Sequence, residues 1–88
     1  MTLIDLIGNT RLVELQNIPV NKSVKIYGKL EGDNPGGSVK DRAAYGMIKA
    51  ALDRGDVKPG QKLVEATSGN TGIALAMIAG IMGLKITL

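Results

Sequence analysis

The segment from Thr71 to Met82 constrains the fold more than any other part of this 88-residue chain. It contains no charged residue, and its apolar side chains lie on nearly all sides of a predicted helix that Gly83 ends. Such a helix needs cover on every face, so it belongs between the layers of a larger fold. The apolar run Ile73–Leu84 is too short to cross a membrane, which takes about 20 residues. We therefore expect a soluble, cytoplasmic protein without a membrane partner.

A second helix and three strands accompany this segment. Val39–Arg54 is predicted to be a helix that ends at Gly55, and Val24–Glu31, Lys62–Ala66 and Lys85–Leu88 are predicted to be strands. The apolar residues at helical spacing in the first helix are Ala44, Met47, Ile48, Ala51 and Leu52. The order strand, helix, strand, helix, strand predicts an α/β fold, with a parallel sheet and right-handed crossover helices.

Parallel sheets have both faces covered by other parts of the protein. Two helices are too few to cover both faces of a three-stranded sheet. The last predicted strand also reaches the end of the sequence at Leu88. We therefore expect residues 1–88 to be the N-terminal portion of a larger three-layer α/β/α protein. By itself this portion is expected to be neither a stable domain nor active.

Composition narrows the functional classes. The net charge is +3, but the basic residues are scattered from Arg11 to Lys85 among acidic ones, and Tyr27 and Tyr45 are the only aromatic residues. This pattern favours a solvated surface over a nucleic-acid interface. The sequence has no cysteine and no histidine, so we expect no disulfide, no metal site and no histidine base in this segment.

Ser38-Val39-Lys40-Asp41-Arg42 places a lysine in the predicted first turn of a helix. Ser38 and Asp41 have the spacing of a capping box, which would begin the helix here. The partial positive charge of a helix N-terminus disfavours an ammonium group, so the neutral amine of Lys40 becomes easier to reach. A neutral amine is the form that Schiff-base chemistry needs. The alternative is an ordinary exposed helical lysine, the fate of most lysines.

A second small-residue loop, Thr67-Ser68-Gly69-Asn70-Thr71-Gly72, joins a predicted strand to the apolar helix. Backbone N–H groups at such a helix start bind anions. The loop lacks both the dinucleotide fingerprint and the P-loop pattern, which favours a carboxylate over a nucleotide phosphate. The alternative is a solvated helix cap with a Thr or Ser side chain at the N-cap.

These blocks together resemble the fold-type II family of pyridoxal-phosphate (PLP) enzymes, and most closely the cysteine synthases (O-acetylserine sulfhydrylases). The matching text is Gly8-Asn9-Thr10, Lys29-Leu30-Glu31, Asn34 to Arg42, and Glu65 to Ala76. The likeness extends over nearly the whole chain. Arg11 departs from the family pattern, which has proline after Gly-Asn-Thr.

The resemblance implies a role for each candidate residue. Lys40 would hold PLP as a Schiff base and, once the substrate displaces it, act as a base at the substrate α-carbon. Asn70 would hydrogen-bond the phenolic oxygen of PLP. The residues that would bind the amino-acid carboxylate are Thr67, Ser68, Gly69, Asn70 and Thr71. The phosphate loop and the serine near the pyridine nitrogen would lie beyond Leu88. Asn34, Gly36, Gly37, Asp41 and Arg42 are expected to be structural, with Arg42 paired to an acid.

The implied activity is β-replacement, which makes L-cysteine from O-acetyl-L-serine and sulfide in a homodimeric transferase. Cystathionine β-synthase is the alternative within the same chemistry, and other fold-type II lyases are more distant. A non-catalytic module that uses Ile73–Met82 to pack on a partner chain is the alternative from another class.

Overall fold

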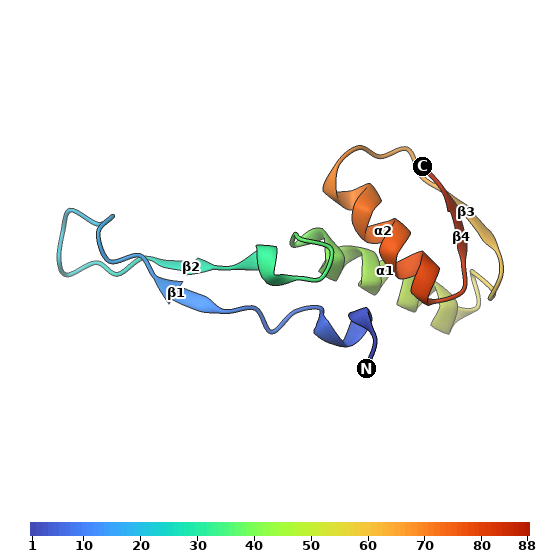
Figure 1. Cartoon of the computed structure of the whole chain (residues 1–88), viewed down its shortest axis with the longest axis horizontal. Coiled ribbons are helices and arrows are strands. Elements are labelled where there is room, and N and C mark those ends of the chain that lie inside the picture. Colours follow the sequence, from blue (N-terminus) through green and yellow to red (C-terminus); the bar gives the residue numbers. More distant parts are fainter.

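The computed structural model describes all residues, 1–88, and has two parts (Figure 1). Strands β1 (Leu12–Glu14) and β2 (Tyr27–Lys29) form an arm, and helices α1 (Lys40–Arg54) and α2 (Asn70–Ile81) with strands β3 (Lys62–Val64) and β4 (Lys85–Thr87) form a helical unit. Two short 3-10 helices, η1 (Leu3–Leu6) and η2 (Glu31–Asp33), lie where the arm meets this unit. The molecule is elongated, with extents of 54 × 27 × 21 Å.

Both helices form where the apolar spacing predicts them, and each end lies within one residue of its predicted position. Gly55 and Gly83 follow them in the left-handed conformation, with φ of 80° and 75°. This conformation carries little strain for glycine, and it turns the chain so that the last helical carbonyls find donors. The Gly55 N–H donates to the Leu52 carbonyl, and the Leu84 N–H donates to the Ala79 carbonyl. The predicted stop signals are therefore confirmed.

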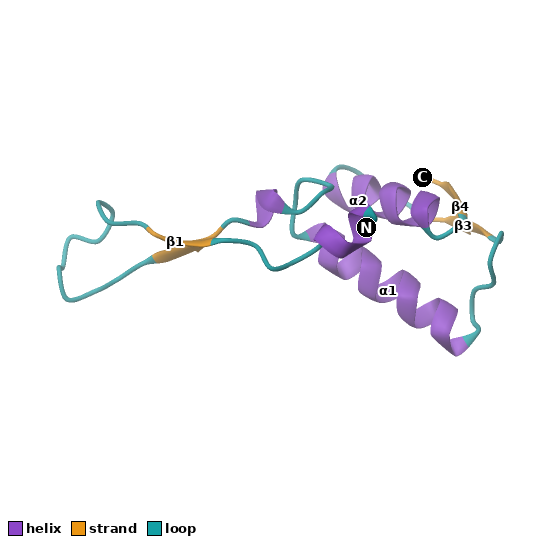
Figure 2. Ribbon diagram, turned by 60° about the horizontal axis from the view of Figure 1, so that its bottom comes forward, coloured by secondary structure: helices purple, strands orange, loops and turns teal.

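The core lies mainly between α1 and α2, which run side by side (Figure 2). Small side chains let the two helices approach closely, because alanine methyl groups fill the centre of the contact. The buried apolar residues are Ala44, Ile48, Ala74, Leu75, Ile78, Ala79 and Leu84. The helix α2 also packs on β4.

The strands form two separate pairs. The parallel pairing of β3 and β4 across α2 is as predicted, with Leu63 opposite Ile86. The prediction that the first strand joins this parallel sheet is wrong, because β2 pairs antiparallel with β1 and places Val13 opposite Gly28. Alternating side chains predict that a strand forms but do not specify its partner.

The capping box predicted at the start of α1 is also wrong. The Ser38 hydroxyl accepts a hydrogen bond from the Lys40 N–H at 3.2 Å, but the Asp41 carboxylate turns inward and accepts from the Gly36 N–H at 2.6 Å. The same sequence pattern does form a capping box earlier, where Thr2 and Asp5 bond reciprocally around η1.

Much of the apolar surface is uncovered within these 88 residues. Only 11 residues are buried, and in α2 Ile73 remains 53% exposed. A groove of about 260 Å³ also opens between the helices and the parallel strands. Its apolar lining comes from Met47, Ile48, Ala51, Val57, Leu63, Val64, Leu75 and Ile86. None of the helices has the length and apolarity needed to cross a membrane.

Residues 1–88 expressed alone should therefore self-associate, because exposed apolar surface and the open edges of β3 and β4 favour contacts between copies. Sedimentation velocity should show oligomers, and the thermal melt should be broad. Replacing the exposed Val64 and Ile73 with glutamine should shift the distribution toward smaller species. A monodisperse wild-type monomer with a cooperative melt would contradict this expectation.

Candidate functional site

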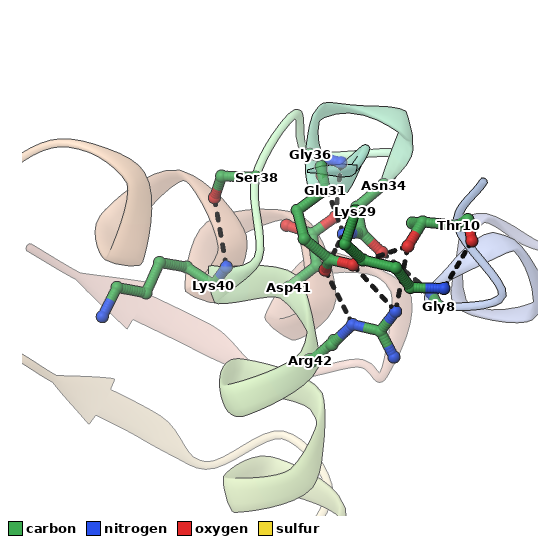
Figure 3. A network of polar contacts seen from close by, with 10 residues as sticks. All are labelled: Gly8, Thr10, Lys29, Glu31, Asn34, Gly36, Ser38, Lys40, Asp41 and Arg42. Carbon is green, nitrogen blue, oxygen red and sulfur yellow. Dashed lines mark hydrogen bonds and ion pairs between the residues drawn. The ribbon is translucent and has the colours of Figure 1, made fainter. Parts of the chain in front are cut away.

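Lys40 is the first residue of α1, and its side chain is exposed. Its Nζ atom makes no hydrogen bond and no ion pair with another part of the chain, whereas the backbone N–H is held by Ser38. Figure 3 shows the side chain extending away from the polar cluster beside it. The amine is therefore free to react, and the backbone fixes only where its side chain begins.

Asp41 ties the glycine loop to the first turn of α1. Its side chain is fully buried, and its Oδ2 atom accepts the Gly36 N–H, while Oδ1 has no hydrogen-bond partner. A Cβ atom at Gly36 would come within 2.9 Å of Asp41 Cγ. Glycine is required at this position because the carboxylate occupies the space that a side chain would need.

Arg42 pairs with an acid, as the sequence predicts, and the acid is Glu31 of η2. The Arg42 Nε and Nη2 atoms donate to the two carboxylate oxygens of Glu31 at 2.8 and 3.1 Å (Figure 3). The Thr10 hydroxyl donates to the same carboxylate at 2.5 Å and accepts a bond from Arg42 Nη2 at 3.2 Å. The ion pair thus joins the N-terminal segment, η2 and α1.

These contacts, the Arg42 hydrogen bond first, hold the pKa of Glu31 at about 2, well below its usual value. A lowered pKa means that the ionised carboxylate is favoured in the folded protein. The stabilisation is present above about pH 4.5 and is lost as the pH falls through about 2. Glu31 therefore stays ionised throughout the neutral range.

Asn34 completes this network at the other side of Glu31. Its Nδ2 atom donates to the Glu31 backbone carbonyl at 2.8 Å and to the Glu31 carboxylate at 3.0 Å. Its Oδ1 atom accepts the Gly8 N–H at 2.8 Å. Asn34 is buried and its side-chain groups are paired, so it links the N-terminal turn to the glycine loop.

Local sequence patterns indicate no role for Thr10 and Glu31 and only a structural one for Asn34. These residues stand 21 to 32 positions from at least one partner in the chain, so local patterns cannot reveal their contacts. The only signal was their presence in the blocks that carry the family resemblance. Arg11, the departure from the family pattern, pairs with Asp33 at 2.8 Å, which a proline could not do.

The loop before α2 leaves several backbone donors unused. The N–H groups from Ser68 to Gly72 donate no hydrogen bond within the chain, and no side chain caps the helix. Gly69 precedes the helix with φ of 72° and ψ of −137°, a conformation that only glycine adopts without strain. The alternative of a Thr or Ser cap is therefore absent, and the free donors suit an anion.

Two other features shape this loop. Ser68, Gly69 and Asn70 are exposed, whereas Thr67 and Thr71 are half-buried, and Thr71 also lines the apolar groove. A Cβ atom at Gly72 would lie 3.0 Å from the Thr67 methyl carbon, so glycine lets the loop close against the first turn. The loop is therefore packed at its two ends and open in the middle.

The fold places the two predicted sites at one end of the helical unit. Lys40 begins α1, Asn70 begins α2, and both helices start at the end nearest the arm (Figures 1 and 2). No hydrogen bond joins Lys40 to the loop of residues 67–72. The arrangement provides a free amine and a set of free backbone donors at adjacent helix ends. No group of three His, Cys, Asp or Glu side chains is placed to hold a metal ion.

A family model described as pyridoxal-phosphate dependent enzyme matches residues 3–88. The chain belongs to this family. It is 59% identical over 87 residues to cysteine synthase B of Pseudomonas aeruginosa, a match that covers 99% of this chain and 29% of the relative. It is 56% identical over 81 residues to the O-acetylserine dependent cystathionine beta-synthase of Bacillus subtilis, covering 92% of this chain and 26% of the relative.

The structural comparison agrees. The crystal structure of O-acetylserine dependent cystathionine beta-synthase from Helicobacter pylori superposes with a TM-score of 0.90 at 40% identity, over 98% of this chain and 29% of that one. The expected fold class, the N-terminal part of a fold-type II PLP enzyme, is therefore confirmed. The chain spans less than a third of the length of these relatives.

Members of the family depend on PLP, and the residues of this chain fit part of that cofactor. The exposed amine of Lys40 has no competing partner, so it is available to the cofactor's aldehyde carbon. That the phosphate loop and the serine near the pyridine nitrogen lie beyond Leu88 remains a prediction.

Gly36→Ala should destabilise the full-length protein by about 1–3 kcal/mol, because the new methyl group must displace the Asp41 carboxylate. Gly32→Ala is the matched control, since the nearest atom to its Cβ would be the Gly37 carbonyl oxygen at 3.9 Å. It should change stability by no more than about 0.5 kcal/mol. Urea denaturation measures both, and equal stability of the two variants would contradict the packing described for Asp41.

Proposed function

We propose that the full-length protein is a cysteine synthase that makes L-cysteine from O-acetyl-L-serine and sulfide. The observation that carries the proposal is the free Lys40 amine at the start of α1, beside an α2 start whose N–H groups are free. The relatives named cysteine synthase B support this specificity. We include in the proposal, on the resemblance alone, that the enzyme is a cytoplasmic homodimer.

When bound, PLP withdraws electrons from the α-carbon of an amino acid, which eases loss of its α-proton and of its β-substituent. Lys40 Nζ would hold the cofactor through its aldehyde carbon in the absence of substrate. Once the substrate amine has displaced it, the Lys40 amine would act as the base that takes the α-proton. After acetate has left the β-carbon and sulfide has added there, Lys40 would return a proton to the α-carbon, which completes the β-replacement.

The loop before α2 binds and orients the amino acid. The backbone N–H groups of Asn70, Thr71 and Gly72 point from a helix N-terminus, where a carboxylate is stabilised by charge and by hydrogen bonds. The hydroxyl groups of Thr67, Ser68 and Thr71 would add donors, and the Asn70 amide would hydrogen-bond the phenolic oxygen of the cofactor. Binding the carboxylate here fixes which bonds of the α-carbon face Lys40.

A cystathionine β-synthase is the second candidate, and the 56% identity to the Bacillus subtilis enzyme of that name favours it. The two candidates share the Lys40 chemistry and differ in the nucleophile that adds at the β-carbon. Supplying sulfide or a thiol amino acid to the full-length protein, and separating cysteine from cystathionine, distinguishes them. A non-catalytic module would show no cofactor absorbance with PLP.

Borohydride reduction of the PLP-loaded full-length protein should fix the cofactor on Lys40, and peptide mapping should find the label there. Lys40→Ala should lose the label. Lys29 is a useful internal control because its Nζ atom is bound to the Thr10 carbonyl at 2.5 Å. A label on Lys29, or on any lysine other than Lys40, would refute the assignment.

Thr71→Ala should weaken amino-acid binding while PLP stays bound. The lost charge-assisted hydrogen bond is worth about 1.5–3 kcal/mol, which corresponds to roughly ten- to a hundred-fold in affinity. Titration of the cofactor absorbance with amino acid measures this affinity. Thr71→Ser retains the hydroxyl and should bind nearly as well as wild type, and an unchanged affinity in Thr71→Ala would exclude this hydroxyl from the carboxylate site.

A further inference from the structure

The Glu31 carboxylate is the most heavily bonded side-chain group in the chain. It accepts four side-chain hydrogen bonds, two from Arg42, one from Thr10 and one from Asn34. Its side chain is 21% exposed, so the bonds form at a partly covered position, where charge-assisted contacts are strong. No step of the proposed reaction uses this carboxylate.

The Lys40 side chain, in contrast, makes no hydrogen bond and no ion pair. The place where this side chain begins, and the direction of its Cα–Cβ bond, depend on the backbone between two fixed points, which are Asn34 before the glycine loop and Arg42 after it. Glu31 bonds to both of these residues. It therefore holds the two ends of the segment that carries the amine.

The segment between these points would otherwise be mobile. It contains two consecutive glycines, and Gly37 has φ of 92°, so its backbone has many accessible conformations. Ordering such a loop costs conformational entropy, which the contacts at its ends must offset. The Asp41 bond to Gly36 fixes the middle of the loop, and Glu31 fixes both ends.

We propose that Glu31 is a positioning residue for Lys40, acting through Arg42 and Asn34 to fix the loop and the first turn of α1. This inference rests on the proposed role of Lys40. Glu31 does not touch the amine, so its contribution is the orientation of the reactive group rather than chemistry.

The chain offers a matched control two residues away. Asp33 also belongs to η2 and also accepts two bonds from an arginine, Arg11, at 2.8 and 3.0 Å. The Arg11 side chain is 74% exposed, and neither member of this pair bonds to the glycine loop or to α1. Asp33→Asn removes a carboxylate of the same kind without loosening Lys40.

In the full-length protein, Glu31→Gln should therefore change hydrogen exchange and kcat, whereas Asp33→Asn should not. In Glu31→Gln, amide hydrogen exchange over residues 36–44 should accelerate at least ten-fold, because the first turn of α1 opens more often. Its kcat should fall about ten-fold or more, with the amino-acid KM within two-fold of wild type, and borohydride should still label Lys40. Asp33→Asn should match wild type within two-fold in each measurement.

Measurements between pH 6 and 8 keep Glu31 ionised in the wild-type protein. Thr10→Val is a second, milder variant, since it removes the hydroxyl's bonds to Glu31 and Arg42 and keeps the charges and the side-chain shape. Its exchange rate over residues 36–44 should lie between those of wild type and Glu31→Gln. If Glu31→Gln does not fold, Thr10→Val with wild-type exchange and kcat overturns the proposal.

Equal behaviour of Glu31→Gln and Asp33→Asn would overturn the positioning role while leaving Lys40 in place. A fall in kcat with unchanged exchange over residues 36–44 would also overturn it, because Glu31 would then act by another route. A wild-type label on a lysine other than Lys40 would instead refute the proposed function, and the positioning role with it.

Discussion

The ion pair between Glu31 and Arg42 joins the arm to the helical unit. Its partners come from the N-terminal turn, η2 and the first turn of α1, which are far apart in the sequence. Because Glu31 is partly covered, removing one partner would leave a charge that water solvates incompletely. The surrounding hydrogen bonds from Thr10 and Asn34 make the pair part of a network, and networks of this kind specify one arrangement. The place where α1 begins depends on this arrangement.

The sequence predicted the parts of the structure that depend on local pattern. The apolar spacing from Ala44 to Leu52 and the glycines at 55 and 83 located α1 and α2, because helix periodicity and left-handed stops act within a few residues. The parallel pairing of β3 with β4 followed from the intervening helix. The positions of Lys40 and of the loop of residues 67–72 at helix starts also followed from these signals.

Long-range contacts could not be predicted in this way. The predicted sheet for β2 is wrong, because the alternation of its side chains does not reveal the partner strand at Leu12–Glu14. The capping-box pattern occurs twice, and it forms at Thr2 and not at Ser38. The reason is that Asp41 finds a buried donor in the Gly36 N–H, which competes with the cap. Contacts of Glu31 depend on the complete fold and carry no local signal.

The alanines between the helices have a consequence for the two predicted sites. Ala44 of α1 and Ala74 and Ala79 of α2 are fully buried in one cluster, so single methyl groups determine how near the helix axes lie. The distance between the helix axes also helps to set how far apart α1 and α2 begin, and therefore how far Lys40 lies from Asn70. Buried side chains at least one helical turn from Lys40 and Asn70 thereby act as spacers, and their volume contributes to the separation of the two helix starts.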